Sequence, residues 1–186
     1  MNLNDWFDKG QTFQAYVEGM NTNQQEMLHI YENVALTVEE QSLLEANQKK
    51  GWRMISLTAD WCGDAMLCVP IMKRITEVLE IDMRFLIRDE NLELMDQYLT
   101  NGTSRSIPIF ILIDEQGQER AVWGPRAPEV QQMVTEMRKA LPPQDDPTFA
   151  EKQKEMIQTF RERISNDTTI WDFVKSSIIG KLLATF

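Results

Sequence analysis

The sequence predicts an α/β domain with helical additions at both ends, and three features of its apolar pattern carry this prediction. Residues 54–58 form a short apolar run, residues 63–79 a helical pattern, and residues 83–87 a second apolar run. A strand, a helix and a strand of these lengths are typical of a right-handed parallel unit. A third run, residues 107–113, is followed by Asp114-Glu115-Gln116-Gly117, and the Asp and Gly of this connection favour a hairpin.

Helices are predicted for residues 1–51, which we assign to an N-terminal helical extension. Asn21-Thr22-Asn23 interrupts the apolar pattern, so two helical segments are expected before a third at residues 37–50. The third has Thr37 as a candidate N-cap, acids in its first turn and lysines in its last, an order that complements the helix dipole. The first 50 residues carry eight acids and three bases, half of the net charge of −10, and we interpret them as a solvated outer face.

The core is predicted to span residues 52–141 and to continue beyond the hairpin turn. The apolar pattern there predicts a helix at residues 92–99, a strand at residues 118–123 and a closing helix at residues 128–140. The central order is therefore β-α-β-α-β-β-α.

A Pro-rich linker and a C-terminal helical extension are predicted for residues 142–186. Three prolines within residues 141–147 forbid a continued helix and favour extended backbone. A charged helix is expected at residues 149–164, and apolar side chains then recur at helical spacing over residues 170–186. We expect this last stretch to pack back onto the core; docking to a partner or a membrane surface is the alternative.

Charge and composition limit the partners and the location that we expect for this protein. A chain of 186 residues with 19 Lys and Arg against 29 Asp and Glu lacks a broad basic surface for phosphate backbones, so nucleic acid is not an expected partner. No apolar run approaches the roughly 20 residues that span a bilayer, and Met1-Asn2-Leu3-Asn4-Asp5 lacks the pattern of a signal peptide. We therefore expect a cytoplasmic protein with no membrane span.

Cys62 is the candidate reactive residue. It lies where a predicted strand ends and a helix begins, so free backbone N–H groups and the helix dipole favour its thiolate. Asp60 and Asp64 oppose this effect with their negative charges, and an inert buried cysteine is the alternative. Because Cys68 and His29 are the only other cysteine and histidine, we expect neither a metal site nor a Cys-His nucleophile pair.

The sequence around Cys62 resembles the thioredoxin family. The matching residues are Ala59-Asp60-Trp61-Cys62-Gly63-Asp64-Ala65, Pro70, Ile107-Pro108 and Gly124. The resemblance covers residues 52–140 and implies a central mixed sheet flanked by helices. It also implies that Cys62 opens the active-site helix and that Pro108 is a cis-proline facing the sulfur.

A narrower resemblance is to a bacterial thioredoxin-like subfamily with an N-terminal helical extension and WCGDA in place of WCGPC. Its motifs are Arg88-Asp89-Glu90-Asn91, Leu94-Met95-Asp96 and Trp123-Gly124-Pro125-Arg126. This similarity implies no detailed role, and no metal or organic cofactor.

The sequence departs from the family pattern at two positions. Ala65 stands where thioredoxins carry a second, resolving cysteine, and Ser56 stands where they usually bury an acid that serves it. Cys68 does not replace the resolver, because six residues along one helix separate the Cα atoms by about 10 Å, beyond the roughly 7 Å limit for a disulfide. We expect Cys68 to be buried. The two departures are consistent with a monothiol mechanism; an engineered Cys-to-Ala change at position 65 is the alternative and implies dithiol chemistry.

The resemblance also implies a substrate-binding surface beside the sulfur. Ile107, which precedes Pro108, offers its backbone to an extended substrate segment, and Trp61 provides an apolar platform or packs partly buried. The expected substrate-binding residues are Trp61, Gly63, Asp64, Ile107, Pro108 and Arg88.

Arg88 and Arg126 are the candidate cations of this surface. Arg88 is expected to offset the charges of the two acids that flank Cys62, or to hold a carboxylate of a small thiol. An ordinary ion pair with Asp89 or Glu90 is the alternative. Arg126 is the weaker candidate of the two.

The leading functional hypothesis is a thiol-disulfide oxidoreductase that acts through Cys62 alone. An external thiol, either a low-molecular-weight thiol or a thiol-reductase partner, then resolves the mixed disulfide formed with a protein disulfide or a thiol adduct. A redox-inactive binding module is the alternative from another class, with a groove formed by Trp61, Ile107-Pro108 and Trp123-Gly124. A peroxidase ranks lower, because Thr58 lies four residues before the sulfur and not three. Oligomeric state is not predicted.

Overall fold

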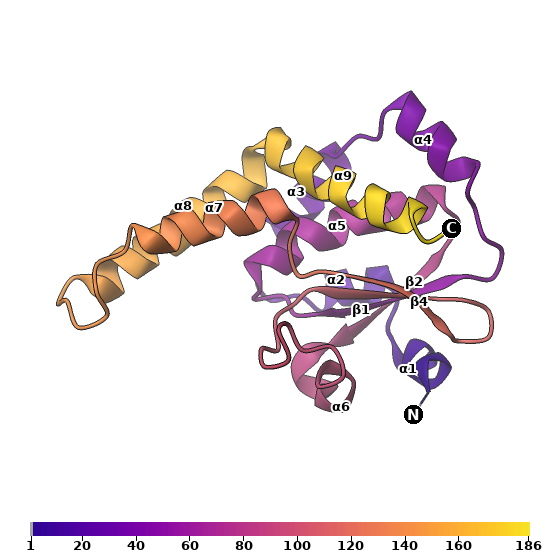
Figure 1. The fold of residues 1–186 in the computed structure, drawn as a ribbon, viewed down its shortest axis with the longest axis horizontal. Coiled ribbons are helices and arrows are strands. Elements are labelled where there is room, and N and C mark those ends of the chain that lie inside the picture. The colour runs from indigo at the N-terminus through magenta and orange to yellow at the C-terminus, as the bar shows by residue number, and fades with distance from the viewer. Residues whose placement is uncertain (1) are drawn as a thin grey trace.

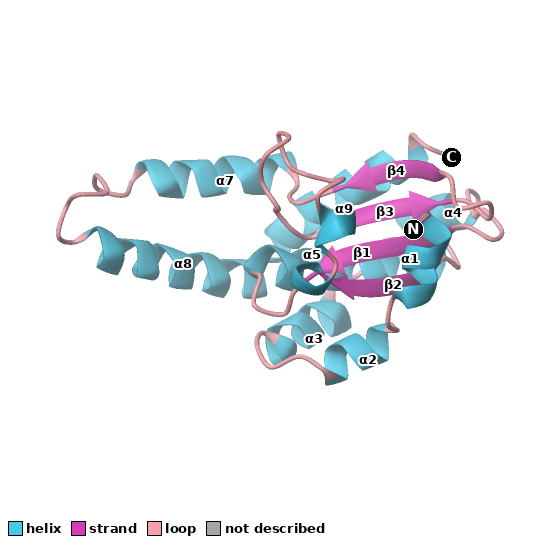
Figure 2. Ribbon diagram, turned by 90° about the horizontal axis from the view of Figure 1, so that it is seen from below, coloured by secondary structure: helices cyan, strands magenta, loops and turns pink. Residues whose placement is uncertain are grey.

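A four-stranded mixed sheet with the strand order β2-β1-β3-β4 forms the centre of the computed structural model, which describes residues 2–186 (Figures 1 and 2). β1 pairs in parallel with β2 and antiparallel with β3, and β3 pairs antiparallel with β4. The strands are β1 (Arg53–Thr58), β2 (Asp82–Ile87), β3 (Ile109–Ile113) and β4 (Glu119–Trp123). The prediction of an α/β domain with a mixed sheet flanked by helices is confirmed.

Two apolar layers cover the two faces of this sheet. Side chains alternate along β1, so Met54 faces one layer while Ile55 and Leu57 face the other. The larger layer lies between the sheet and α5 (Gly63–Val78), which connects β1 to β2. The smaller layer lies under α1 (Leu3–Lys9) and α6 (Leu92–Met95), on the opposite face (Figure 1). Both faces are buried, which explains why the strands read as continuous apolar runs.

The N-terminal helices contain one more break than the sequence predicts. α1 ends at Lys9 and α2 (Phe13–Glu18) begins after a short extended segment, in which Gln11 exchanges backbone hydrogen bonds of 3.0 and 2.9 Å with Phe85 of β2. Gly10 makes this approach possible, because a Cβ there would lie 2.7 Å from the Cβ of Arg84. A long-range backbone contact thus divides what the apolar pattern presents as one segment.

The other helices and strands differ from the predicted ranges by a few residues at their ends. After α3 (Gln24–Asn33), α4 covers only Val38–Glu45; Thr37 caps it as predicted, in a capping box with Glu40, but the helix ends before the two lysines expected in its last turn. α6 also ends early, at Met95, and a single 3-10 turn, η1 (Arg88–Glu90), precedes it. β3 begins at Ile109, after Pro108, which has no N–H to donate to the ladder.

The C-terminal helices form a projecting hairpin and a returning helix. α7 (Pro128–Lys139) and α8 (Phe149–Asn166) run side by side away from the sheet, and α9 (Thr168–Leu183) comes back across the layer that contains α5 (Figures 1 and 2). Trp171, Val174 and Ile178 of α9 are buried in that layer. The expectation that the last stretch packs onto the core is therefore confirmed. Within residues 2–186, every helix is too short or too polar to cross a membrane.

One buried lysine joins the two terminal extensions. The Nζ atom of Lys175 in α9 lies 3.1 Å from a carboxylate oxygen of Glu40, 3.0 Å from one of Asp172, and donates to the carbonyl of Ala35 at 3.0 Å. Lys175 is 5% exposed, so this ammonium group is satisfied almost entirely by protein atoms.

We predict that Lys175→Met lowers the free energy of unfolding by about 2 kcal/mol, because Glu40 and the Ala35 carbonyl lose a charged donor. Urea unfolding followed by circular dichroism measures this. Lys181→Met, an exposed position on the same helix, is the matched control and is expected to change stability by less than about 0.5 kcal/mol. Equal effects of the two substitutions would contradict the role assigned to Lys175.

Candidate thiol site

Cys62 lies at the N-terminus of α5, against the loop that precedes β3. The antiparallel pairing of β1 and β3 brings the end of β1 beside the start of β3, so the residues after one strand meet those before the other. The Cys62 Sγ donates to the carbonyl oxygen of Ile107 at 3.4 Å. The Ile107–Pro108 peptide bond is cis. The structure thus brings Cys62, Ile107 and Pro108 together.

The Cys62 thiol is half-buried, and this burial controls its ionisation. The pKa of the Cys62 thiol is raised to about 11: burial is the largest cause and the negative charge of Asp64 acts in the same direction, while backbone N–H groups of Ala65 and Asp64 and the charge of Arg126 oppose the rise. The helix N-terminus therefore contributes in the direction expected from the sequence, but burial and Asp64 outweigh it. The sequence indicated both effects, the helix N-terminus favouring the thiolate and Asp64 opposing it, and burial adds to the opposing side.

Asp64 is held by Arg126, and not by Arg88. The Arg126 guanidinium donates to both Asp64 carboxylate oxygens, at 2.7 and 2.6 Å, and to Gln131 at 2.9 Å. Burial raises the pKa of the Asp64 carboxyl, and the hydrogen bonds from Arg126 offset part of that rise. The expectation that Arg88 offsets the flanking acids is wrong for Asp64, whose partner is Arg126 in the loop between β4 and α7; Asp60 accepts from the backbone N–H of Asn21 at 2.8 Å.

Arg88 instead lies on the face of Trp61. Its guanidinium carbon is 4.6 Å from the centre of the Trp61 ring, a cation–π contact, while its side chain also pairs with Asp89 at 2.7 Å. It donates as well to the carbonyl of Arg105 at 3.2 Å. Trp61 is 45% exposed, so the platform expected beside the sulfur is present. The alternative of an ion pair with Asp89 is also correct.

The two departures from the family motif, Ser56 and Ala65, both lie in the interior. Ser56 is on β1, while Ala65 and Cys68 are on α5 in the larger apolar layer. Ser56 and Ala65 are buried, and the Ser56 hydroxyl has no hydrogen-bond partner among the described residues. Cys68 is 1% exposed in the apolar layer of α5, with its Sγ 3.9 Å from the carbonyl of Pro125. Both cysteines are free thiols. The prediction that Cys68 is buried is confirmed.

His29 takes no part in the site. Its ring lies against Trp171 with centroids 5.9 Å apart, and its Nδ1 is 3.3 Å from the amide of Asn33. No group of three or more His, Cys, Asp or Glu side chains within residues 2–186 is arranged to hold a metal ion.

The helix α8 covers the first turn of α5, a contact that the sequence did not reveal. A Cβ added to Gly63 would lie 3.9 Å from side-chain atoms of Phe160, Arg161 and Ile164. Arg161 also donates to the carbonyl of Trp61 at 3.1 Å. The C-terminal extension therefore forms one wall of the thiol site.

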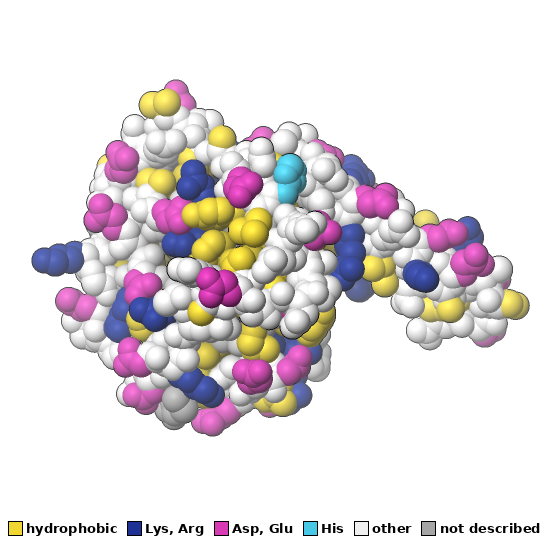
Figure 3. Space-filling model, turned by 180° about the vertical axis from the view of Figure 1, so that it is seen from behind, with side chains coloured by type: hydrophobic (Ala, Val, Ile, Leu, Met, Phe, Trp, Pro, Cys, Tyr) yellow, Lys and Arg dark blue, Asp and Glu magenta, His cyan; other side chains and the backbone are white. Residues whose placement is uncertain are grey.

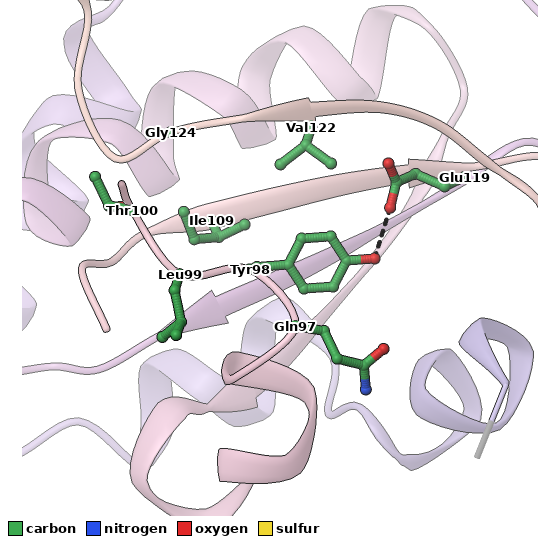
Figure 4. A pocket seen from close by; sticks show the side chains of 8 residues that line it. All are labelled: Gln97, Tyr98, Leu99, Thr100, Ile109, Glu119, Val122 and Gly124. Atoms are coloured by element: carbon green, nitrogen blue, oxygen red, sulfur yellow. Dashed lines mark hydrogen bonds between the residues drawn. The ribbon is translucent and has the colours of Figure 1, made fainter. Parts of the chain in front are cut away.

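A separate cavity of about 510 Å³ lies beyond the Pro108 loop and does not include Cys62 (Figure 4). Across it, the Tyr98 hydroxyl donates to Glu119 at 2.7 Å. Gly124, on its margin, has φ of +133°, and a Cβ there would lie 2.2 Å from the carbonyl oxygen of Pro108. Only glycine allows this approach, which gives a steric reason for Gly124 in the motif.

A mixed sheet whose first strand leads to a cysteine at a helix N-terminus, opposite a proline that precedes a neighbouring strand, defines the class of thioredoxin-like folds. The chain belongs to the thioredoxin family, since a family model described as Thioredoxin matches residues 10–138. The match begins within the N-terminal helices, so the similarity extends beyond residues 52–140.

Two solved structures share this fold over the full length of the chain. A protein of unknown function from Pseudomonas aeruginosa is 16% identical with a TM-score of 0.69, covering 100% of this chain and 96% of its own. An HIV epitope scaffold is 17% identical with a TM-score of 0.66, covering 100% of this chain and 97% of its own. None of the curated proteins compared with the chain matches it.

We predict that alkylation of Cys62 by iodoacetamide accelerates about tenfold per pH unit between pH 7 and pH 10. The thiolate fraction rises in this way below a pKa of about 11. Peptide mass spectrometry at Cys62, in timed quenches, measures the rate. A rate that levels off between about pH 9 and pH 10 would mean that the thiol ionises like an ordinary exposed cysteine, with a pKa of about 8.5.

We predict that Asp64→Asn accelerates the same alkylation at pH 8, because it removes a charge that raises the pKa of Cys62. Each unit by which the pKa falls gives tenfold more thiolate but a less nucleophilic one, for a net gain of about threefold. Asp89→Asn, an exposed acid paired with Arg88, is the control. An unchanged or slower rate for Asp64→Asn would remove Asp64 from the control of the thiol.

Proposed function

We propose that this protein is a thiol-disulfide oxidoreductase that acts as a monothiol through Cys62. The observation that carries the proposal is the position of Cys62 at the N-terminus of α5, 3.4 Å from the Ile107 carbonyl, with Ala65 at the place of a resolving thiol. Trp61 and the segment Ile107-Pro108 border the sulfur on the side from which a substrate disulfide approaches.

The reaction has two exchange steps. The Cys62 thiol loses its proton to solvent, and the thiolate attacks one sulfur of a substrate disulfide; a new S–S bond forms, the old one breaks, and the second substrate sulfur leaves as a thiolate that takes up a proton. An external thiol then attacks the substrate sulfur of the mixed disulfide and releases Cys62. After these two steps at Cys62, a second molecule of the external thiol attacks the disulfide that the first has formed with the substrate; two external thiols are thus oxidised to one disulfide, the substrate disulfide is reduced to two thiols, and Cys62 returns unchanged.

Each neighbouring residue has a proposed part in this reaction. The Ile107 backbone beside Pro108 pairs with the substrate segment, Trp61 packs against it, and Gly63 leaves room at the start of the helix. Asp64 disfavours the thiolate in the free protein and so restrains reaction with unspecific disulfides. Arg88, over Trp61, is placed to bind a carboxylate of the substrate or the resolving thiol.

The proposed compartment and partners follow from the chemistry of Cys62 and from the net charge of the chain. The proposed reaction starts from a reduced Cys62 and consumes an external thiol, so we place the protein in a reducing compartment, the cytoplasm. The proposed partners are protein disulfides or low-molecular-weight thiols, with a thiol reductase as a possible source of the resolving thiol. A net charge of −10 disfavours nucleic acid.

A redox-inactive binding module is the second candidate, and two observations favour it. With the pKa of Cys62 raised to about 11, about one thiol in ten thousand is ionised at pH 7. In addition, α8 covers the first turn of α5. In such a module Trp61 and the Ile107-Pro108 segment hold a peptide without covalent chemistry; Trp123 is buried and its indole N–H donates to Ser177 at 3.0 Å, so it does not form part of the groove expected from the sequence.

Turnover of bis(2-hydroxyethyl) disulfide with an excess of a small thiol tests the proposal. We predict that Cys62→Ser abolishes the protein-dependent rate, while Cys68→Ala, at the buried thiol, leaves it within about twofold because Cys68 does not reach the substrate. Activity retained by Cys62→Ser would overturn the monothiol mechanism. The variant Ala65→Cys tests the third possibility: no gain in dithiol activity would rule out a native resolving cysteine at position 65.

A further inference from the structure

The hairpin of α7 and α8 encloses an apolar groove that the chemistry above does not use. Two cavities of about 120 and about 390 Å³ lie between the helices, and Arg138, Met156 and Ile157 line both, so they form one continuous groove. The remaining lining residues are Arg126, Val134, Met137, Leu141, Pro142, Gln144, Phe149, Gln153 and Phe160. Figure 3 shows this arm, which projects from the body and carries hydrophobic patches among charges of both signs.

The inner end of the groove reaches the thiol site. Arg126, which lines the smaller cavity, binds the carboxylate of Asp64, two residues after Cys62. Phe160 forms the opposite wall, and a Cβ added to Gly63, the residue next to Cys62, would lie 3.9 Å from its ring. Cys62 itself does not line the groove, so a chain that occupies the groove and continues past Arg126 and Phe160 comes to lie beside the first turn of α5.

The lining combines apolar side chains with unpaired positive charge. Ile157 is 47% exposed, one of the few large apolar side chains left so accessible. Among residues 2–186, Arg138 on the groove has no carboxylate within ion-pair distance, although its charge is close enough to Asp64 to lower the pKa of that carboxyl. Arg126 and Arg138 are the charged side chains that line this groove, and no acid in the described part of the chain lines it although the chain has 29 acids and 19 bases, so the groove favours an acidic and apolar ligand.

We infer that this groove binds the segment of a protein substrate that flanks the cysteine attacked by Cys62, in an extended conformation with alternating apolar and acidic residues. This inference rests on the proposed function and assigns it a protein substrate. The 12 residues of α7 give the groove a length of about 18 Å. An extended segment of about five or six residues spans that length.

Three synthetic peptides serve as probes. Each carries one cysteine, capped as a mixed disulfide with 2-mercaptoethanol; two have five alternating leucine and glutamate residues before or after the cysteine, and the third has glycine and serine on both sides. Cys62 attacks the peptide sulfur, a Cys62–peptide disulfide forms, and 2-mercaptoethanol leaves. Intact mass spectrometry follows the rate, and bis(2-hydroxyethyl) disulfide is the small reference substrate.

We predict that one of the two leucine-glutamate peptides reacts at least about tenfold faster than the glycine-serine peptide, since burial of one or two apolar side chains supplies this factor. Ile157→Glu is expected to remove most of that advantage and to leave the rate with the small disulfide unchanged. Leu43→Glu, at a position on α4 that is 48% exposed, is the matched control and should keep the advantage. Arg138→Gln should reduce the advantage chiefly at low salt.

The outcomes separate this inference from the proposed function. If the wild-type protein reacts with no disulfide, including the small one, the proposed function fails. If it reacts with the small disulfide and all three peptides at similar rates, or if Ile157→Glu has no effect, the groove does not select protein segments and only this inference fails. Sedimentation velocity adds one further test: a wild-type dimer that Ile157→Glu converts to a monomer would assign the groove to a second copy of the chain, and would overturn the inference.

Discussion

The bidentate ion pair between Asp64 and Arg126 joins the first turn of α5 to the loop that follows β4. Both side chains are largely buried, so removal of either partner leaves a charge in an apolar setting. The pair also sets the electrostatics of Cys62, because Asp64 raises the pKa of the thiol and Arg126 lowers it. Its arginine lines the inner end of the α7–α8 groove. One interaction thus connects the helix terminus, the thiol and the neighbouring groove.

The thiol site is assembled from three parts of the chain that differ in how firmly they are held. Cys62 and Ile107 are fixed by the central strands β1 and β3, whose pairing lies in the interior. The wall formed by α8 rests on side-chain contacts at Gly63 and one hydrogen bond from Arg161 to Trp61. Loosening of that wall would hydrate the sulfur and reduce the desolvation that keeps it protonated. Reactivity of the thiol is therefore tied to the packing of the C-terminal extension.

The sequence predicted the central fold well because β1 and β3 are buried on both faces and stand out as apolar runs. It placed Cys62 beside Ile107 and Pro108 through a motif. It did not predict the pairing of Arg126 with Asp64, since the two residues are 62 positions apart and no local pattern links them. The break at Gly10 was also missed, because a backbone contact with β2 creates it. The contact of Phe160 and Arg161 with Gly63 was missed as well, because it joins α8 to the distant helix α5. Each of these features depends on contacts between residues far apart in the sequence, which local secondary-structure propensity does not predict.

The backbone contact between Gln11 and Phe85 has a consequence for association between molecules. β2 is an outer strand of the sheet, and such a strand exposes unpaired N–H and C=O groups that recruit strands from other chains. Gln11 occupies both groups of Phe85 in the middle of β2, and α1 and α2 follow the same border. The N-terminal extension thus protects this edge against intermolecular sheet growth and aggregation, and leaves β4, with Glu119 and Arg120 exposed, as the open border.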